Sequence, residues 1–214
     1  MESSSESRRP IATRDTGWAK RTAAYLATHG ISPNTISVFS IVFSFFGLLA
    51  FYADLQSTGF GLHILWMILA IACIQLRLIM NLFDGMVAVE HHQKSVIGGL
   101  FNEVPDRISD TFTLFGVGLL VKHMPYGMDL AYLAIILSVT TAYIRTLGAS
   151  LGCPHYFIGP MAKQHRMALV CAACIVAIFY VPVFYYVLIV MNIGLLVTCW
   201  RRLAKVVDCL KKNN

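Results

Sequence analysis

Acidic residues crowd the segment between residues 81 and 110, which joins two apolar stretches long enough to cross a membrane. They are Asp84, Glu90, Glu103, Asp106 and Asp110, in a chain with only 11 Asp and Glu residues. Acidic side chains at the edge of a bilayer are costly unless an opposite charge compensates them. A divalent metal ion or a cationic partner would supply that charge, so we expect chemistry in this segment.

The spacing of these polar residues places them on helix faces. Those with helical spacing are Arg77, Asn81 and Asp84 in the first stretch, and Asn102, Asp106 and Asp110 in the second. Each set falls on one face if its stretch is helical. A hairpin of two such helices would bring together the side-chain oxygens that Mg²⁺ and Mn²⁺ prefer as ligands. The segment therefore predicts a hard-cation site. The alternative is a charged, solvent-exposed loop between two membrane helices that binds no ion.

The same segment resembles the signature of the CDP-alcohol phosphatidyltransferase family. That signature reads D-x-x-D-G-x-x-A-R, then eight residues, then G-x-x-x-D-x-x-x-D, and the chain matches its spacing throughout. The positions with the family residue are Asp84, Gly85, Ala88, Gly98 and Asp106. Asn81 and Asn102 replace Asp, and Val89 replaces Arg. A weaker similarity lies at residues 32–35, which include Asn34 and resemble the opening of the family's first membrane helix.

The resemblance implies phospholipid synthesis. A phosphatidyl or similar substituted phosphate group passes from a CDP-alcohol to an alcohol acceptor, and CMP is released. The implied ligands for Mg²⁺ or Mn²⁺ are Asn81, Asp84, Asn102 and Asp106, and Asp106 is also the implied catalytic base. The implied nucleotide contacts are Asn34, Gly85, Ala88 and Gly98, although small residues also serve close helix packing. The compact chain favours CDP-diacylglycerol as donor, and the resemblance implies a homodimer.

The departures from the signature change the charge of the predicted site. Two Asn residues in place of Asp remove two negative charges, and Val89 cannot make the contact of an Arg. Asp110, one turn beyond Asp106, or Glu103 would restore an acid. A catalytically silent relative that binds CDP-lipid or a partner is therefore an alternative function. An ion-coupled transporter is another, although transporters more often carry acids at mid-membrane.

Three cations outside this segment form a second candidate site. Arg145 ends one apolar stretch, and Lys163 and Arg166 precede the next. Cations of this kind bind the phosphate of a lipid donor or a phosphorylated acceptor. Their alternative role is to set membrane topology and to contact lipid headgroups.

Hydropathy predicts an all-α integral membrane protein. The 214 residues have a mean hydropathy of +0.66 and only 13% charged residues. Six stretches read as spanning helices of the kind that needs ~20 apolar residues, at 35–53, 62–82, 108–121, 130–147, 167–180 and 183–200. An interfacial amphipathic helix is expected at 16–30, after a disordered tail at 1–15, and the membrane domain then covers 31–214.

The basic residues predict the orientation. With six spans, nearly all Lys and Arg residues lie on one side, which the positive-inside rule makes cytoplasmic. Both termini and the acidic segment are then cytoplasmic, as expected for a bacterial inner-membrane protein. The net charge of +6 is explained by topology and lipid contact, not by nucleic-acid binding. The six Cys residues predict neither a metal site nor a disulfide framework, and Cys153 and Cys209 look isolated.

Overall fold

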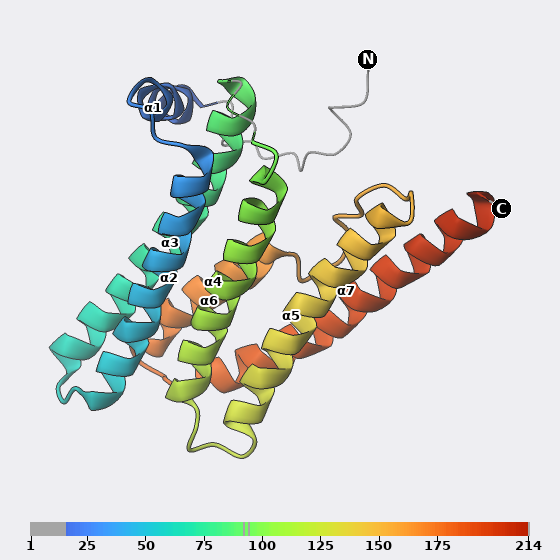
Figure 1. Ribbon diagram of the computed structural model, residues 1–214. Coiled ribbons are helices and arrows are strands. Elements are labelled where there is room, and N and C mark those ends of the chain that lie inside the picture. The colour runs from blue at the N-terminus through green and yellow to red at the C-terminus, as the bar shows by residue number, and fades with distance from the viewer. Residues whose placement is uncertain (1–15, 92, 94, 214) are drawn as a thin grey trace. The chain divides into compact units, whose positions relative to one another are not determined.

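The computed structural model describes residues 16–91, 93 and 95–213. Seven helices occur in that part: α1 (Gly17–Thr28), α2 (Pro33–Gln56), α3 (Phe60–Glu90), α4 (Gly98–Leu120), α5 (Gly127–Ser150), α6 (Lys163–Ala177) and α7 (Val183–Asn213) (Figure 1). The predicted all-α class is confirmed. The described chain divides into two compact units, a first unit of residues up to Gly116 and a second unit from Val117 onward, so the division in the sequence falls within α4. The predicted disordered tail falls on residues outside the described part.

Four helices of the described chain are long and apolar enough to cross a membrane. They are α2, α3, α5 and α7, whose mean hydropathies lie between 1.6 and 2.1. The chain is an integral membrane protein with several apolar spans. In contrast, α4 carries Glu103, Asp106, Arg107 and Asp110 within its 23 residues, and α6 has only 15 residues. Six spans therefore remain a prediction.

The buried face of α2 is polar and its exposed face is apolar. Ser37, Ser40 and Ser44 are buried at helical spacing. The exposed face of the same helix carries Val38, Phe39, Val42, Phe45, Phe46 and Leu49. A soluble protein shows the reverse pattern, so this helix fits a lipid environment. It packs along α3 as an antiparallel neighbour (Figure 1), and a Cβ at Gly47 would lie 3.3 Å from Cβ of Cys73.

The helix α1 forms where an interfacial helix was predicted, and it packs on the end of α3. Its position at the membrane interface stays a prediction. Ala19 and Ala23 are buried against α3, and the Trp18 ring meets the Phe83 ring edge-on at 5.9 Å between centroids. The turn into α2 has a positive-φ glycine and a serine N-cap. Gly30 adopts a φ of +71°, and Oγ of Ser32 accepts the backbone N–H of Thr35 at 3.2 Å.

Two helix boundaries differ from the sequence predictions. The third apolar stretch was expected to begin near residue 108, but α4 begins at Gly98. Its first turns are polar and include the predicted site, so hydropathy alone misses them. The last helix continues beyond Trp200 because its charged tail keeps good helix-forming residues. The motif residues of both stretches lie within helices, as their spacing predicts.

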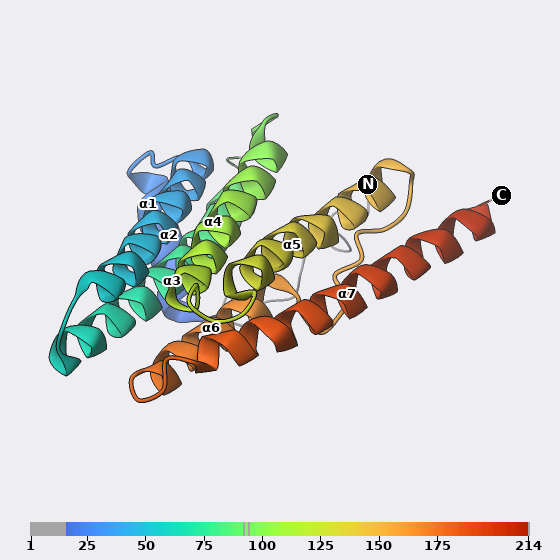
Figure 2. The same cartoon turned by 90° about the horizontal axis from the view of Figure 1, so that it is seen from below.

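The second unit contains a disulfide that the sequence analysis missed. In this unit α5 and α7 run side by side, and α6 packs against α7 (Figure 2). Cys153 follows α5 and Cys209 lies near the end of α7; they form a disulfide with a Cα–Cα distance of 6.1 Å across 56 residues. Their apparent isolation in the sequence was misleading, because only the pairing of α5 with α7 brings them together.

Candidate functional site

Asp84 is the most buried of the four candidate metal ligands. It lies on the inner face of α3, where it is 5% exposed. Oγ of Ser37, on α2, donates a hydrogen bond to Oδ2 of Asp84 at 2.6 Å. A buried carboxylate needs such a partner because desolvation penalises its charge. Ser37 therefore fixes the orientation of the Asp84 side chain, a contact that the sequence analysis did not anticipate.

Asn81 lies one turn before Asp84 on α3 and is partly buried. Its Nδ2 atom is shielded from solvent and has no hydrogen-bond partner within the described part of the chain. An unsatisfied buried amide is costly. A half-turn of this amide would present its oxygen at the same place, where a hard cation would bind it.

The α4 positions are more open than the α3 positions. Asn102 is exposed, and the Asp106 side chain is 15% exposed with Oδ2 3.5 Å from Nη2 of Arg107. Among the described residues, a Cβ at Gly98 would lie within 4 Å of Oγ of Ser95 alone, at 3.4 Å. An added methyl group would therefore be accommodated there.

The other predicted nucleotide contacts lie near the same end of the first unit. Asn34, at the start of α2, donates from Nδ2 to Oγ of Ser95 at 3.4 Å. Gly85 and Ala88 follow Asp84 on the last turns of α3 and are partly buried. The fold thus places these residues around the connection between α3 and α4.

Asp110, a predicted extra acid, forms an ion pair with Arg77. Both side chains are buried, at 1% and 0% exposure. The Arg77 guanidinium neutralises the Asp110 carboxylate within the helix pair. Glu103, the other predicted extra acid, is partly buried on α4 next to Asn102.

The donor chemistry of the four positions fits a hard cation. The described residues contain no group of three or more His, Cys, Asp or Glu side chains placed to hold a metal ion. Such a group is not expected here, because two of the four positions are Asn. Two carboxylates and two amide oxygens are ligands that Mg²⁺ and Mn²⁺ accept. The unsatisfied amide of Asn81 agrees with this assignment.

The second unit buries three arginines. Arg166 is 2% exposed and donates from Nη1 to the carbonyl of Met161 at 2.8 Å. Arg145 is 9% exposed, and its guanidinium lies 4.9 Å from the centre of the Phe157 ring. Lys163, the other predicted phosphate ligand, is partly buried at the start of α6.

Arg202 is the third of these arginines, and from the sequence it counts only among the basic residues that predict the orientation. It is 5% exposed, and its Nη1 donates to the carbonyl of Thr141 at 2.6 Å. Its Nε donates to the carbonyl of Ile158 at 3.0 Å. The signal was masked because Arg202 stands beside exposed Arg201 in a basic tail. Helical spacing from the buried Thr198 would have placed it on the inner face of α7.

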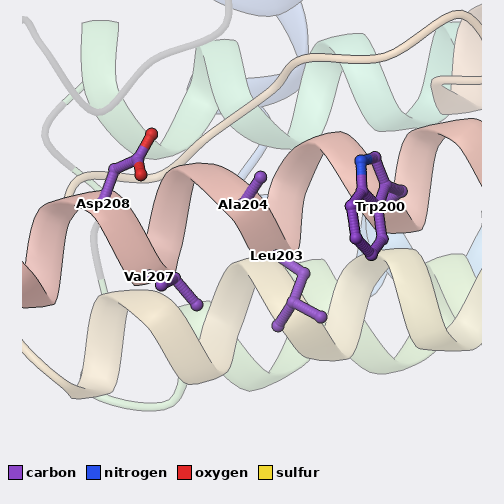
Figure 3. Close-up of a pocket in the computed structure, with 5 residues that line it drawn as sticks. All are labelled: Trp200, Leu203, Ala204, Val207 and Asp208. Carbon is purple, nitrogen blue, oxygen red and sulfur yellow. The ribbon is translucent and has the colours of Figure 1, made fainter.

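A surface pocket on α7 is lined by none of the predicted site residues. It has a volume of about 240 Å³ and is lined by Trp200, Leu203, Ala204, Val207 and Asp208 (Figure 3). Trp200 is 73% exposed, so the pocket is a shallow surface feature. Its apolar lining suits lipid contact, and we do not assign it to the reaction.

Replacing Ser37 tests its role as the partner of Asp84. We expect Ser37→Ala to weaken Mn²⁺ binding about 10-fold, because loss of a hydrogen bond to a metal ligand commonly has this effect. Electron paramagnetic resonance of detergent-solubilised protein measures free and bound Mn²⁺. Ser40→Ala is the matched control, since Ser40 is buried on the same face and its hydroxyl donates to the Ser37 carbonyl. Equal Mn²⁺ affinity in both variants would contradict the assigned role.

Comparisons with known proteins find a distant relative in sequence and similar solved structures. No family model matches the chain. The sequence is 26% identical, over 153 residues, to an archaetidylinositol phosphate synthase of Pyrococcus horikoshii, and the match covers 71% of this chain and 73% of the relative.

The fold is similar to solved structures of a phosphatidylinositol phosphate synthase from Mycobacterium tuberculosis. The structure in complex with manganese and citrate has a TM-score of 0.71 and 19% identity, with 88% of each chain covered. The structure with CDP-DAG bound has a TM-score of 0.70 and 19% identity, covering 88% of this chain and 92% of the other. The archaeal relative and the shared fold confirm the resemblance of this chain to the CDP-alcohol phosphatidyltransferase family that its motif spacing indicated.

Proposed function

We propose that this protein transfers a phosphatidyl group from CDP-diacylglycerol to an alcohol acceptor and releases CMP. The observation that carries the proposal is the buried Asp84, held by Ser37 on the helix that also bears Asn81. The solved relative that binds CDP-DAG supports this donor class. The basic residues favour a cytoplasmic site in a bacterial inner membrane, where nucleotides are available.

The proposed reaction is a displacement at phosphorus. The acceptor oxygen attacks the β-phosphorus of the CDP-alcohol while the bond from that phosphorus to the bridging oxygen breaks. CMP leaves with the bridging oxygen, and the carboxylate of Asp106 takes the proton of the acceptor hydroxyl. Asp106 suits this role because it is partly exposed, so an acceptor can reach it.

The residues that would hold Mg²⁺ or Mn²⁺ are Asn81, Asp84, Asn102 and Asp106. When bound, the cation would neutralise the negative charge of the pyrophosphate. Gly85, Ala88 and Gly98 have no side chain or a small one, which would let the nucleotide approach the backbone beside these ligands. Asn34 would contact the nucleotide from the start of α2.

The buried arginines support a phosphate-bearing ligand in the second unit. Arg145, Arg166 and Arg202 place three buried guanidinium groups in this unit. We propose that these arginines, with Lys163, bind the phosphate of the donor or of a phosphorylated alcohol.

Product identification tests the proposed function. Purified protein in lipid should convert labelled CDP-diacylglycerol into a new phospholipid when supplied with a suitable member of a panel of alcohols. The panel contains glycerol phosphate, inositol phosphate, free inositol and serine. If a phosphate is required, only phosphorylated alcohols should yield product, because the buried arginines favour an anion. No new lipid with any acceptor would oppose the proposal.

The two Asn residues also support a second candidate function. A neutral side chain at two metal positions weakens cation binding, and a silent relative that only binds CDP-lipid or a partner would tolerate this. Such a protein would bind CDP-diacylglycerol and yield no CMP. The two candidates therefore differ in turnover and not in donor binding.

Substitutions of Asn102 test whether it is a neutral metal ligand. We expect Asn102→Asp to tighten Mn²⁺ binding about 10-fold, because an anionic oxygen attracts the cation more strongly. Asn102→Leu should weaken binding. Titration with Mn²⁺ measures both. The control is Leu100→Asp, which adds the same charge at an exposed neighbour on α4. Equal tightening by Leu100→Asp would show a general charge effect and contradict ligation by Asn102.

A further inference from the structure

The buried ion pair of Arg77 with Asp110 joins the two helices that carry the motif. Arg77 is on α3 and Asp110 is on α4, and neither is a position of the family signature. Removing a charge from water is expensive, and only a close opposite charge with further hydrogen bonds repays that cost. A pair buried this deeply therefore has a strong geometric preference, and a shift of either helix would break it.

The pair lies at the same depth in both helices relative to the residues that connect them. Asn81 lies four residues from Arg77, and Asp106 lies four residues from Asp110, in each case towards the connection between α3 and α4. Asp84 and Asn102 lie seven and eight residues nearer. With a rise of about 1.5 Å per residue, these two sets fall about 6 Å and about 11 Å above the pair.

We propose that Arg77 is a positioning residue, whose ion pair with Asp110 fixes the register of α3 against α4. This inference rests on the proposed metal site, because its purpose is to hold Asn81 level with Asp106 and Asp84 level with Asn102. In lipid, apolar helix faces have little preference for one register, since the surrounding tails are equally apolar. A one-turn slip of α3 along α4 would therefore lose far more free energy by breaking the buried ion pair than by exchanging one apolar contact for another.

The ion pair also gives Asp110 a role different from that of an extra metal ligand. Its carboxylate is neutralised by Arg77 beneath the predicted site. The carboxylate charge of the metal site then comes from Asp84 and Asp106. A second polar contact links α4 to α2, because Oγ of Ser109 on α4 donates a hydrogen bond to the carbonyl of Ser40 on α2 at 3.2 Å.

The test separates register from simple stability. The double variant Arg77→Met with Asp110→Leu replaces the pair by apolar side chains, a change that often preserves folding. Spin labels on Cys introduced at Leu76 of α3 and Val104 of α4, both exposed, report the register by pulsed electron paramagnetic resonance. The four free Cys residues are first replaced by Ala.

We expect the double variant to broaden the distance distribution or to shift it towards one helical turn, about 5 Å. Its Mn²⁺ affinity should fall about 10-fold, as for other residues that support metal ligands. Arg77→Lys keeps the positive charge and should largely preserve both the label distance and the Mn²⁺ affinity. This variant provides the test if the double variant does not fold. His63→Gln removes the His63 pair with Asp54 between α2 and α3 and should change neither readout.

The outcomes separate this inference from the proposed function. A folded double variant with an unchanged distance and unchanged Mn²⁺ affinity would overturn the positioning role. The role would also be overturned if Arg77→Lys lost as much Mn²⁺ affinity as the double variant, because lysine retains the positive charge at this position. Failure of the unmodified protein to bind Mn²⁺ would oppose the metal site alone, since the label distance still reports the register.

Discussion

Asp84→Ala should abolish metal-dependent turnover, with a loss of about 10³-fold or more. Metal ions contribute several kcal/mol of charge stabilisation, and each 1.4 kcal/mol corresponds to a factor of 10 in rate. Asp84 is one of the two carboxylates at the four motif positions, so its loss leaves Asp106 as the single anion. The release of CMP and the Mn²⁺ affinity, measured on the same preparation, should fall together.

Asp54→Ala is the matched control for Asp84→Ala. Asp54 is also a shielded acid in the first unit, with a side chain that is 7% exposed and contacts His63. A general loss of stability would affect both variants, whereas loss of a metal ligand affects Asp84→Ala alone. Asp84→Asn adds a second check, because it keeps an acceptor for Ser37 and removes only the charge. Turnover near the level of the unmodified protein in Asp84→Asn would refute the need for this carboxylate.

Asp106→Ala should remove turnover while much of the nucleotide binding persists. Loss of a general base commonly costs roughly 10²–10⁴-fold in rate. The donor should still bind, because Asp84 and the small residues of α3 remain. Single-turnover CMP release reports the rate, and equilibrium binding of CDP-diacylglycerol reports the affinity.

Asp110→Asn is the informative comparison for Asp106. Asp110 forms an ion pair with Arg77, deeper in the helices than the motif. Substitution of Asp110 should therefore affect the helix register and the stability before it affects proton transfer. If Asp110→Asn reduced the rate more than Asp106→Asn at equal stability, the base would lie one helical turn deeper than we propose. If neither substitution affected metal binding or turnover, the acidic segment would be only a hydrated membrane edge.

The local arrangement of the motif could be predicted from the sequence. Helical spacing placed Asn81 with Asp84 on one helix, and Asn102 with Asp106 on the next, and all four lie in helices of the structure. The helix start at Gly98 was missed, because polar residues open α4 and hydropathy responds only to apolar runs. Segments whose function requires polar residues are those where a hydropathy rule is least informative.

Partnerships between distant residues could not be read from the sequence. The pairs of Ser37 with Asp84 and of Arg77 with Asp110 join different helices, and spacing along one helix carries no information about its neighbour. The Cys153–Cys209 disulfide has the same origin. Such contacts depend on which helix faces meet, a choice that small and polar residues make jointly along the whole helix pair.

The formation of CMP with phospholipid in equal amounts tests the central claim most directly. Purified protein in lipid is supplied with CDP-diacylglycerol, the phosphorylated and free alcohols, and either Mn²⁺ or a chelator. We predict equimolar CMP and new phospholipid with Mn²⁺, no product with chelator, and no product from Asp84→Ala in either condition. Stable, folded protein that binds CDP-diacylglycerol but forms neither product with any acceptor would contradict a transferase and identify a silent CDP-lipid-binding relative.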